Sequence, residues 1–206
     1  MRDGIVLAET SEIIGTGHAE RLMPMVQELM GKADILYSDI GLVAVSIGPG
    51  SFTGVRTGLA AAKGFAQALK IPAIGISTLE AIAFEARKPA NQTSLRVVID
   101  AKRGEVHTQD FDSNGLAQSG PVLLSLADAK GGRGARILAA NGAALVDENA
   151  PHVLPQAATA SIAIFAEIAL LRHATDTTSL TIMPLYLRGA DAKPQGGFAL
   201  LRATAG

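Results

Sequence analysis

Cysteine and tryptophan are absent from the 206 residues of this chain, and aromatic residues make up only 4% of it. Without cysteine the chain has no disulfide, no thiolate metal ligand and no cysteine nucleophile, which is typical of a cytoplasmic protein. An excess of charge of one sign is also lacking, because the formal net charge is −1. We therefore expect no basic surface that contacts nucleic acid directly.

Long hydrophobic runs are missing as well. The most apolar predicted helix, residues 162–171, is too short to cross a bilayer and contains Glu167. Met1 leads within a few residues into a short apolar segment, so no signal peptide is predicted. These features favour a cytoplasmic protein of one large or two small domains that does not contact a membrane.

The sequence is organised around residues 42–58, where an apolar run leads through a glycine–proline turn into a helix. Residues 42–47 (LVAVSI) are rich in β-branched side chains and predict a buried strand. The turn at 48–50 cannot extend this strand, because proline lacks an amide hydrogen and glycine tolerates positive φ. Ser51 or Thr53 is predicted to cap the helix that follows.

Such a junction directs several backbone N–H groups to one place, which suits an anion or the carbonyl groups of a partner. The candidate residues of this turn are Gly48, Pro49, Gly50, Ser51, Phe52, Thr53, Gly54 and Arg56. A tight turn without a ligand explains the pattern equally well. The turn is not a Walker loop, which would continue with lysine after Gly54. Nor does it match the dinucleotide fingerprint, because Gly54 lies one position too far from Gly50.

Two amphipathic helices are predicted on either side of this turn. The first, residues 16–30, carries a methionine-rich apolar stripe, a composition that suits an adaptable binding surface. The second, residues 55–69, contains Gly58 and Gly64, each of which costs about 1 kcal/mol relative to alanine. We therefore expect another backbone to approach it closely. The predicted partner interface consists of Leu22, Met25, Val26, Leu29, Gly58, Leu59, Ala62, Phe65 and Leu69. The alternative is that the first stripe faces the protein's own sheet.

The remaining pattern predicts an α/β protein. Further strands are expected at 4–9, 71–76, 95–100, 105–111 and 136–139, and further helices at 77–86 and 162–172. Residues 185–187 are predicted to be extended. The stretch 88–92 resembles a linker, so we place the domain boundary there. This gives an N-terminal lobe at 1–90, which carries the partner-binding helices, and a C-terminal lobe at 91–206.

Four stretches of the sequence resemble the signatures of a known family. They are residues 48–66 (GPGSFTGVRTGLAAAKGFA), 17–25 (GHAERLMPM), 100–106 (DAKRGEV), and 184–188 (PLYLR) followed by 191–194 (DAKP). In this order they are similar to the TsaB (YeaZ) family, bacterial proteins of the tRNA threonylcarbamoyladenosine pathway. The resemblance implies a two-lobed α/β fold related to actin, Hsp70 and sugar kinases.

The resemblance also implies a function and partners. TsaB proteins are non-catalytic relatives of the TsaD-type subunit, which transfers a threonylcarbamoyl group to adenosine 37 of tRNA, and a TsaE-type ATPase completes the complex. By this resemblance the chain scaffolds and activates the catalytic subunit, contacts tRNA only through the complex, and forms a homodimer when alone. It is expected to need no cofactor, apart from weak ATP or ADP binding at the partner interface.

The family resemblance bears on individual residues too. Catalytic relatives bind a metal through His-x-x-x-His, and the matching positions here are Thr78 and Ile82, so we expect no metal and no catalytic residue. His18 is expected to form hydrogen bonds at the start of its helix, and Asp100 lies at a strand end where this fold often places functional carboxylates. Relatives carry a further strand before Gly4 that forms half of a phosphate site, and its lack here predicts weak nucleotide binding.

Two other functions stay open from the sequence. The first is an autonomous enzyme of the same fold, either a glycoprotease-like metallopeptidase or a small-molecule kinase. It would need a metal or a nucleophile with a base, and Ser51 and Ser77 have no recognisable base partner. The second is a free homodimer that stores the protein, since one helical face can serve both uses.

Overall fold

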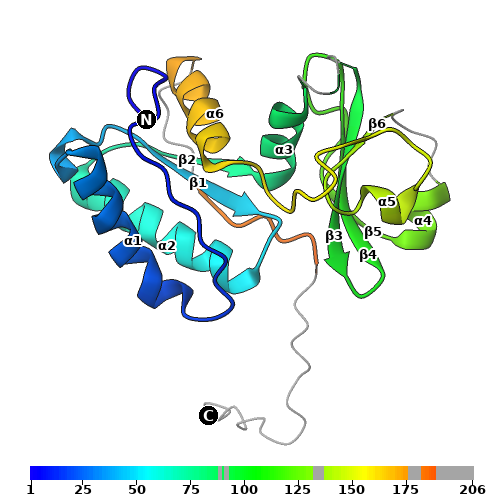
Figure 1. Cartoon of the computed structure of the whole chain (residues 1–206), viewed down its shortest axis with the longest axis horizontal. Helices are drawn as coiled ribbons and strands as arrows, with labels where there is room; N and C mark the ends of the chain where they lie inside the picture. The colour runs from blue at the N-terminus through cyan, green and yellow to red at the C-terminus, as the bar shows by residue number, and fades with distance from the viewer. Residues whose placement is uncertain (88–89, 91–92, 132–136, 176–181, 189–206) are drawn as a thin grey trace, which may run out of the picture.

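The computed structural model describes residues 1–87, 90, 93–131, 137–175 and 182–188. Its secondary structure forms two lobes joined side by side (Figure 1). The first lobe contains a parallel pair of strands, β1 (Val43–Gly48) and β2 (Ala73–Ser77), with the helices α1 (His18–Ala33), α2 (Phe52–Leu69) and α6 (Ile162–Thr175) around it. A single turn of 3-10 helix, η1 (Tyr37–Asp39), links α1 to β1.

The second lobe is built on a five-stranded sheet in the order β5-β4-β3-β6-β7. Its strands are β3 (Leu95–Lys102), β4 (Glu105–Phe111), β5 (Val122–Ser125), β6 (Ile137–Ala139) and β7 (His152–Val153). Strands β3, β4 and β5 are antiparallel, whereas β6 and β7 continue the sheet in parallel. Two short helices, α4 (Leu126–Gly131) and α5 (Ala143–Val146), complete the lobe.

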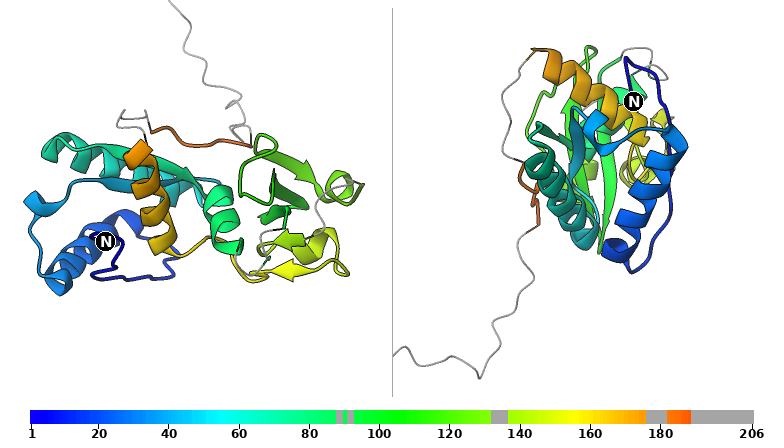
Figure 2. Two further views of the ribbon diagram at one scale, coloured as in Figure 1. Left: turned by 90° about the horizontal axis from the view of Figure 1, so that it is seen from above. Right: turned by 90° about the vertical axis from the view of Figure 1, so that its left-hand side faces the viewer.

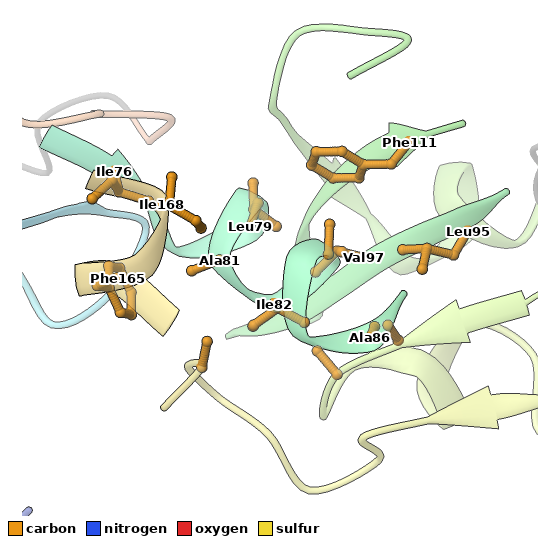
Figure 3. Packing of buried hydrophobic residues seen from close by; sticks show 14 of the residues in the cluster. Ile76, Leu79, Ala81, Ile82, Ala86, Leu95, Val97, Phe111, Phe165 and Ile168 are labelled. Atoms are coloured by element: carbon orange, nitrogen blue, oxygen red, sulfur yellow. The ribbon is translucent and has the colours of Figure 1, made fainter. Parts of the chain in front are cut away.

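Helix α3 (Thr78–Ala86) lies between the lobes and is buried on both sides. Leu79 and Ile82 of α3 pack in one cluster with Phe165 and Ile168 of α6 and with Val97 and Phe111 of the second sheet (Figure 3). Ser77 caps this helix by accepting a hydrogen bond from the Leu79 amide at 3.2 Å. The two lobes therefore share one continuous core, and α3 carries it from one to the other.

The spatial lobes do not follow the division of the sequence at residue 90. Helix α6 and the segment 182–188 belong to the second half of the chain, but α6 packs against β1 and β2 of the first lobe. The segment 182–188 then runs from the first lobe to the second (Figure 2). Its Leu185 amide donates to the Ile47 carbonyl at 2.8 Å, and residues 185–187 form no helix or ladder strand, so the extended conformation expected there stays a prediction. The predicted linker lies mostly outside the described residues, and the boundary itself stays a prediction.

Most predicted elements are confirmed within one to three residues at each end, but the strand at 4–9 was wrong. A single bridge joins Arg2 to Ile5 across the Asp3-Gly4 turn, and residues 6–17 form no regular element. Ile5 is 67% exposed, and Val6 and Leu7 are exposed as well. A strand is stable only where a neighbouring strand accepts its backbone hydrogen bonds, and this segment has no such neighbour among the described residues.

Candidate partner surface and glycine-rich turn

Hydroxyl groups of β1 and α3 stabilise the glycine-rich turn. The Ser46 hydroxyl accepts a hydrogen bond from the Gly48 amide at 3.2 Å and pairs with the Thr78 hydroxyl at 3.0 Å. Gly48 has φ +96°, a conformation that side chains rarely adopt, and the Gly48–Pro49 peptide bond is cis. Gly48 and Pro49 are buried, whereas Gly50 and the next three residues are exposed. Ser51 caps α2 by accepting from the Gly54 amide at 3.3 Å, as predicted.

Three side chains cluster beside this turn, at the start of α2. The Arg56 guanidinium lies 3.8 Å from the centre of the Phe52 ring and 5.5 Å from that of Tyr186. Arg56 Nε also donates a hydrogen bond to the Tyr186 hydroxyl at 2.7 Å, and the two rings lie 6.0 Å apart. Phe52 and Arg56 were named as residues of the turn, but the partnership with Tyr186 was not predicted, because 130 residues separate Arg56 from Tyr186.

Helices α1 and α2 lie side by side on the outside of the first lobe (Figure 1). Helix α1 has no fully buried residue along its 16 residues. Leu22, Met25, Val26 and Leu29 are all half-buried, as are Gly58, Phe65 and Leu69 of α2. Phe65 stacks on Tyr37 of η1, with ring centres 6.0 Å apart. This pair of helices therefore keeps much of its apolar surface accessible in the isolated chain.

Two of the predicted interface residues have a different role. Leu59 is 5% exposed and Ala62 is 4% exposed, and both pack with Ala73 and Ile182 in the core between α2 and the sheet. Periodicity groups them with Phe65 on an apolar stripe, but the sheet occupies the part of the stripe on which they lie. They are therefore not available to a partner, and the interface prediction is left with the half-buried residues.

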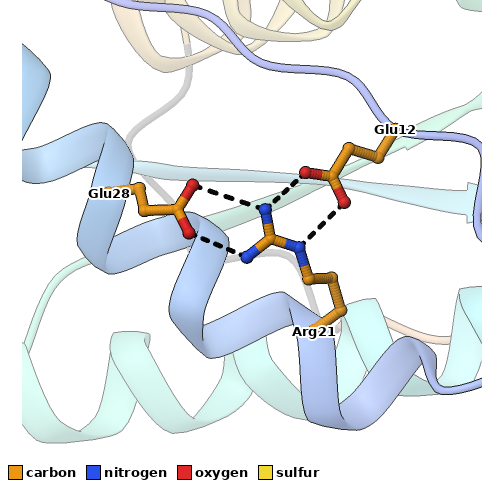
Figure 4. Close-up of polar contacts among 3 residues, drawn as sticks. All are labelled: Glu12, Arg21 and Glu28. Carbon is orange, nitrogen blue, oxygen red and sulfur yellow. Dashed lines mark hydrogen bonds and ion pairs between the residues drawn. The ribbon is translucent and has the colours of Figure 1, made fainter.

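A charged triad attaches the segment that precedes α1 in the sequence to this helix. Arg21 binds Glu12 of the preceding segment and Glu28 two turns further along the helix, and the Arg21–Glu28 contact measures 2.8 Å (Figure 4). The hydrogen bonds from Arg21 lower the pKa of both carboxyl groups, and they raise the pKa of the guanidinium. All three groups are near the surface, so their contribution to stability is small. The triad instead positions the segment around Glu12 along one side of α1.

The other predicted positions hold no reactive arrangement. Thr78 and Ile82, the positions of the metal-binding histidines in catalytic relatives, are both buried in α3. Asp100 accepts hydrogen bonds from the Lys102 amide and ammonium groups at 2.8 and 2.6 Å, and these lower its pKa. His18 lies at the start of α1 next to Gly54 of α2. In the part of the chain that the structure describes, no three potential ligands among His, Cys, Asp and Glu come together as a metal site.

A polar cluster that was not predicted joins the segment 182–188 to the second lobe. Arg188 binds the Glu105 carboxylate and donates to the Ala101 carbonyl at 3.2 Å. His107 lies on the same side of β4, and burial, together with the charge of Arg188, lowers its pKa. Its Nδ1 atom is buried and has no hydrogen-bond partner among the described residues. The sequence gives no local signal for this cluster, because its members come from distant parts of the chain.

None of the described helices is both long enough and apolar enough to span a membrane.

Comparison with known proteins places this chain in a family. The family model for TsaD, described as tRNA N6-adenosine threonylcarbamoyltransferase, matches residues 10–187. An uncharacterised Mycobacterium tuberculosis protein, Rv3421c, is 34% identical over 194 residues, which cover 93% of this chain and 85% of that protein. The tRNA threonylcarbamoyladenosine biosynthesis protein TsaB of Escherichia coli is 39% identical over 116 residues, or 55% of this chain and 50% of TsaB.

Solved structures share the fold. YeaZ from Pseudomonas aeruginosa superposes with a TM-score of 0.72 at 24% identity, covering 85% of this chain and 87% of YeaZ. A second structure, of an uncharacterised protein with similarity to peptidase YeaZ from Pseudomonas aeruginosa, gives the same TM-score at 26% identity and covers 86% of this chain and 87% of that one. The two-lobed α/β fold predicted from the resemblance is therefore confirmed.

Proposed function

We propose, because the chain belongs to the TsaB (YeaZ) family of TsaD-related proteins, that it is a non-catalytic subunit of the enzyme that forms threonylcarbamoyladenosine in tRNA. In this role it binds the TsaD-type catalytic subunit in the cytoplasm and activates it. The TsaE-type ATPase belongs to the same complex, and the chain is linked to tRNA only through that complex. The family relationship favours this function over that of an autonomous peptidase or small-molecule kinase.

The observation that carries this proposal is the accessible apolar surface of α1 and α2. A helix of 16 residues that buries none of them fully gains little from packing in the isolated chain. Its half-buried Leu22, Met25, Val26 and Leu29 lie beside a helix rich in glycine and alanine, which permits close approach of a partner. A specific interface would cover about 800 Å² of this surface, with most of the energy in a few central residues.

The proposed lack of catalysis is supported by the environment of α3. Thr78 uses its hydroxyl to bind Ser46, and Ile82 has no donor atom, so neither side chain is suited to bind a metal. Ser77 uses its hydroxyl to cap α3 and Ser51 uses its own to cap α2. Neither serine has a base within hydrogen-bond distance among the described residues, so neither is set up as a nucleophile.

We further propose that the lone chain binds ATP or ADP only weakly. Residues 48–56, the turn and the first turn of α2, carry a single cation, Arg56, and its Nε is already engaged with Tyr186. A nucleoside triphosphate would gain little binding energy from one such group. In the absence of the catalytic subunit, the same α1–α2 surface supports a homodimer.

The test is co-purification with the TsaD-type subunit of the same organism, followed by a tRNA modification assay with and without this chain. Val26→Asp places a charge on the proposed interface and should weaken binding at least about tenfold. Gln27→Asp adds the same charge on the exposed side of α1 and is the matched control.

Three results would count against the proposal. Modification that proceeds equally well without the chain contradicts an activating role. A Val26→Asp protein that is folded and still binds and activates normally places the interface elsewhere. If Val26→Asp unfolds the lone chain, the stripe of α1 is ordinary core.

A further inference from the structure

Phe52, Arg56 and Tyr186 form an exposed cluster, and no contact among the described residues requires these side chains to be exposed. We propose that it is a docking point for a carboxylate side chain of the partner protein, which binds the guanidinium of Arg56 between the two rings. The inference rests on the proposed function, since it takes the catalytic subunit as the partner. It adds a second contact point beyond the surface of α1 and α2.

The geometry fixes the direction in which Arg56 can bind. Its Nε is taken by the Tyr186 hydroxyl at 2.7 Å, and one face of its planar group covers the Phe52 ring at 3.8 Å. These contacts hold the guanidinium in place, while its two terminal amino groups have no hydrogen-bond partner within the described residues. A carboxylate is the group that such a pair of parallel donors fits best.

The charge of Arg56 is not balanced within the described parts of the chain. The other described arginines that form ion pairs, such as Arg21, Arg96 and Arg172, each bind a carboxylate of the chain itself. For Arg56 no ion pair forms with any residue that the structure describes, and the first turn of α2 contains no acidic residue. An acidic group of a partner therefore meets an uncompensated positive charge here.

The two rings are unusually accessible for aromatic side chains. Phe52 is 59% exposed and Tyr186 is 52% exposed, although each packs on Arg56. Tyrosine and arginine are enriched among the residues that dominate binding energy in protein interfaces. When a partner covers the rings, water is excluded from the ion pair, and its attraction is screened less.

A protein partner fits this cluster better than a nucleic acid does. Binding of a phosphate backbone relies on several cationic side chains. Residues 48–62 contain no lysine or arginine other than Arg56, and the chain has a net charge of −1. A single arginine flanked by aromatic rings matches one carboxylate on a folded surface. The cluster also draws Phe52 and Tyr186 from two of the stretches that carry the family resemblance.

The experiment measures the affinity of purified chain variants for the catalytic subunit of the same organism by calorimetry. Arg56→Gln should weaken binding about tenfold, and Arg56→Glu should weaken it further, because it sets two carboxylates against each other. Arg56→Lys keeps the charge but loses the paired donors, so it should fall between wild type and Arg56→Gln. Phe52→Ala should weaken binding, and Lys63→Gln, two turns along the same helix, is the control for loss of one positive charge.

The outcomes separate this inference from the proposed function. If the wild-type chain binds the catalytic subunit and all Arg56 variants bind within twofold of it, the docking point is wrong while the proposed function stands. If Arg56→Gln and Arg56→Glu are equally weak, the partner group is not a carboxylate. If wild type does not bind the catalytic subunit at all, both proposals fail.

Two further measurements complete the test. Binding of purified tRNA to the lone chain that is lost in Arg56→Gln would assign the cluster to nucleic acid and overturn the inference. Melting temperatures should stay close to that of wild type, because all three side chains are exposed. If Arg56→Glu fails to fold, the comparison of Arg56→Gln with Arg56→Lys decides between the outcomes.

Discussion

Ile47 of β1 and Gly75 of β2 lie so close together that a Cβ atom at Gly75 would sit 2.5 Å from Cγ2 of Ile47. The same atom would lie 3.2 Å from Cγ2 of Ile182, which arrives from the far end of the chain. Neither isoleucine can turn away easily, because β-branched side chains are stiff about χ1. Because residue 75 has no side chain, β1, β2 and the segment that contains Ile182 can pack together against α2.

Gly75→Ala should lower the stability of the isolated chain. The added methyl group has to displace Ile47 or Ile182, and such overpacking typically costs about 1–3 kcal/mol. Urea denaturation followed by circular dichroism measures the change. An unchanged midpoint for Gly75→Ala would mean that the strands separate without cost at this point.

Gly64→Ala should have the opposite effect on stability and weaken partner binding. Nothing lies within 4 Å of a Cβ atom at Gly64, and alanine in a helix interior is favoured over glycine by about 1 kcal/mol. If a partner helix approaches α2 closely, the same methyl group will hold it away. The expected result is a higher melting temperature with a lower affinity for the catalytic subunit. A variant that gains stability and binds unchanged would exclude close approach at Gly64.

Arg172→Ala should loosen α6 from the rest of the first lobe. The Arg172 guanidinium donates to the Gly75 carbonyl at 3.0 Å and to the Glu80 carboxylate at 2.5 Å, so it ties α6 to β2 and α3. Both ionic side chains are about one-third exposed, and the loss should be limited to about 1–2 kcal/mol. Glu80→Gln leaves the bond to Gly75 in place and should cost less. Equal losses for both variants would show that the bond to the Gly75 carbonyl contributes nothing.

His107 should make the protein less stable as the pH falls from about 7.5 to about 5.5. Burial, together with the charge of Arg188, lowers the pKa of His107, although Glu105 acts in the opposite direction. The unfolded chain therefore binds a proton at this residue before the folded chain does, and stability falls with falling pH. His107→Gln removes this proton uptake, so its free energy of unfolding should change less over the same range.

The control for this prediction lies in the carboxyl groups. Glu12, Glu28 and Asp100 have lowered pKa values, so they contribute to acid unfolding only at lower pH, where the unfolded chain begins to protonate them. Below that point wild type and His107→Gln should lose stability in parallel. A pH dependence of His107→Gln that equals that of wild type between about pH 7.5 and 5.5 would rule out His107 as its source.

Local sequence signals determined the central part of this protein. The apolar run before Gly48, the glycine–proline turn and the Ser51 cap each act over a few residues, and together they set strand β1, the turn and helix α2. The same holds for α3 with its Ser77 cap and for the pair β3–β4. In each case the signal itself, an apolar run, a turn or a helix cap, lies within the segment or directly beside it, so the pattern alone predicts the element.

Tertiary structure decided what the surfaces of these elements do. Periodicity shows that Leu59 and Phe65 belong to one apolar stripe, but only the position of the sheet decides that Leu59 is core and that Phe65 stays half-exposed. Residues 5–7 have the composition of a strand, yet none of the strands in the described parts of the chain offers an edge that accepts their hydrogen bonds. Arg56 meets Tyr186 only because segment 182–188 returns to the first lobe. Contacts between residues so far apart depend on the packing of the whole chain, because no local interaction holds the two residues together.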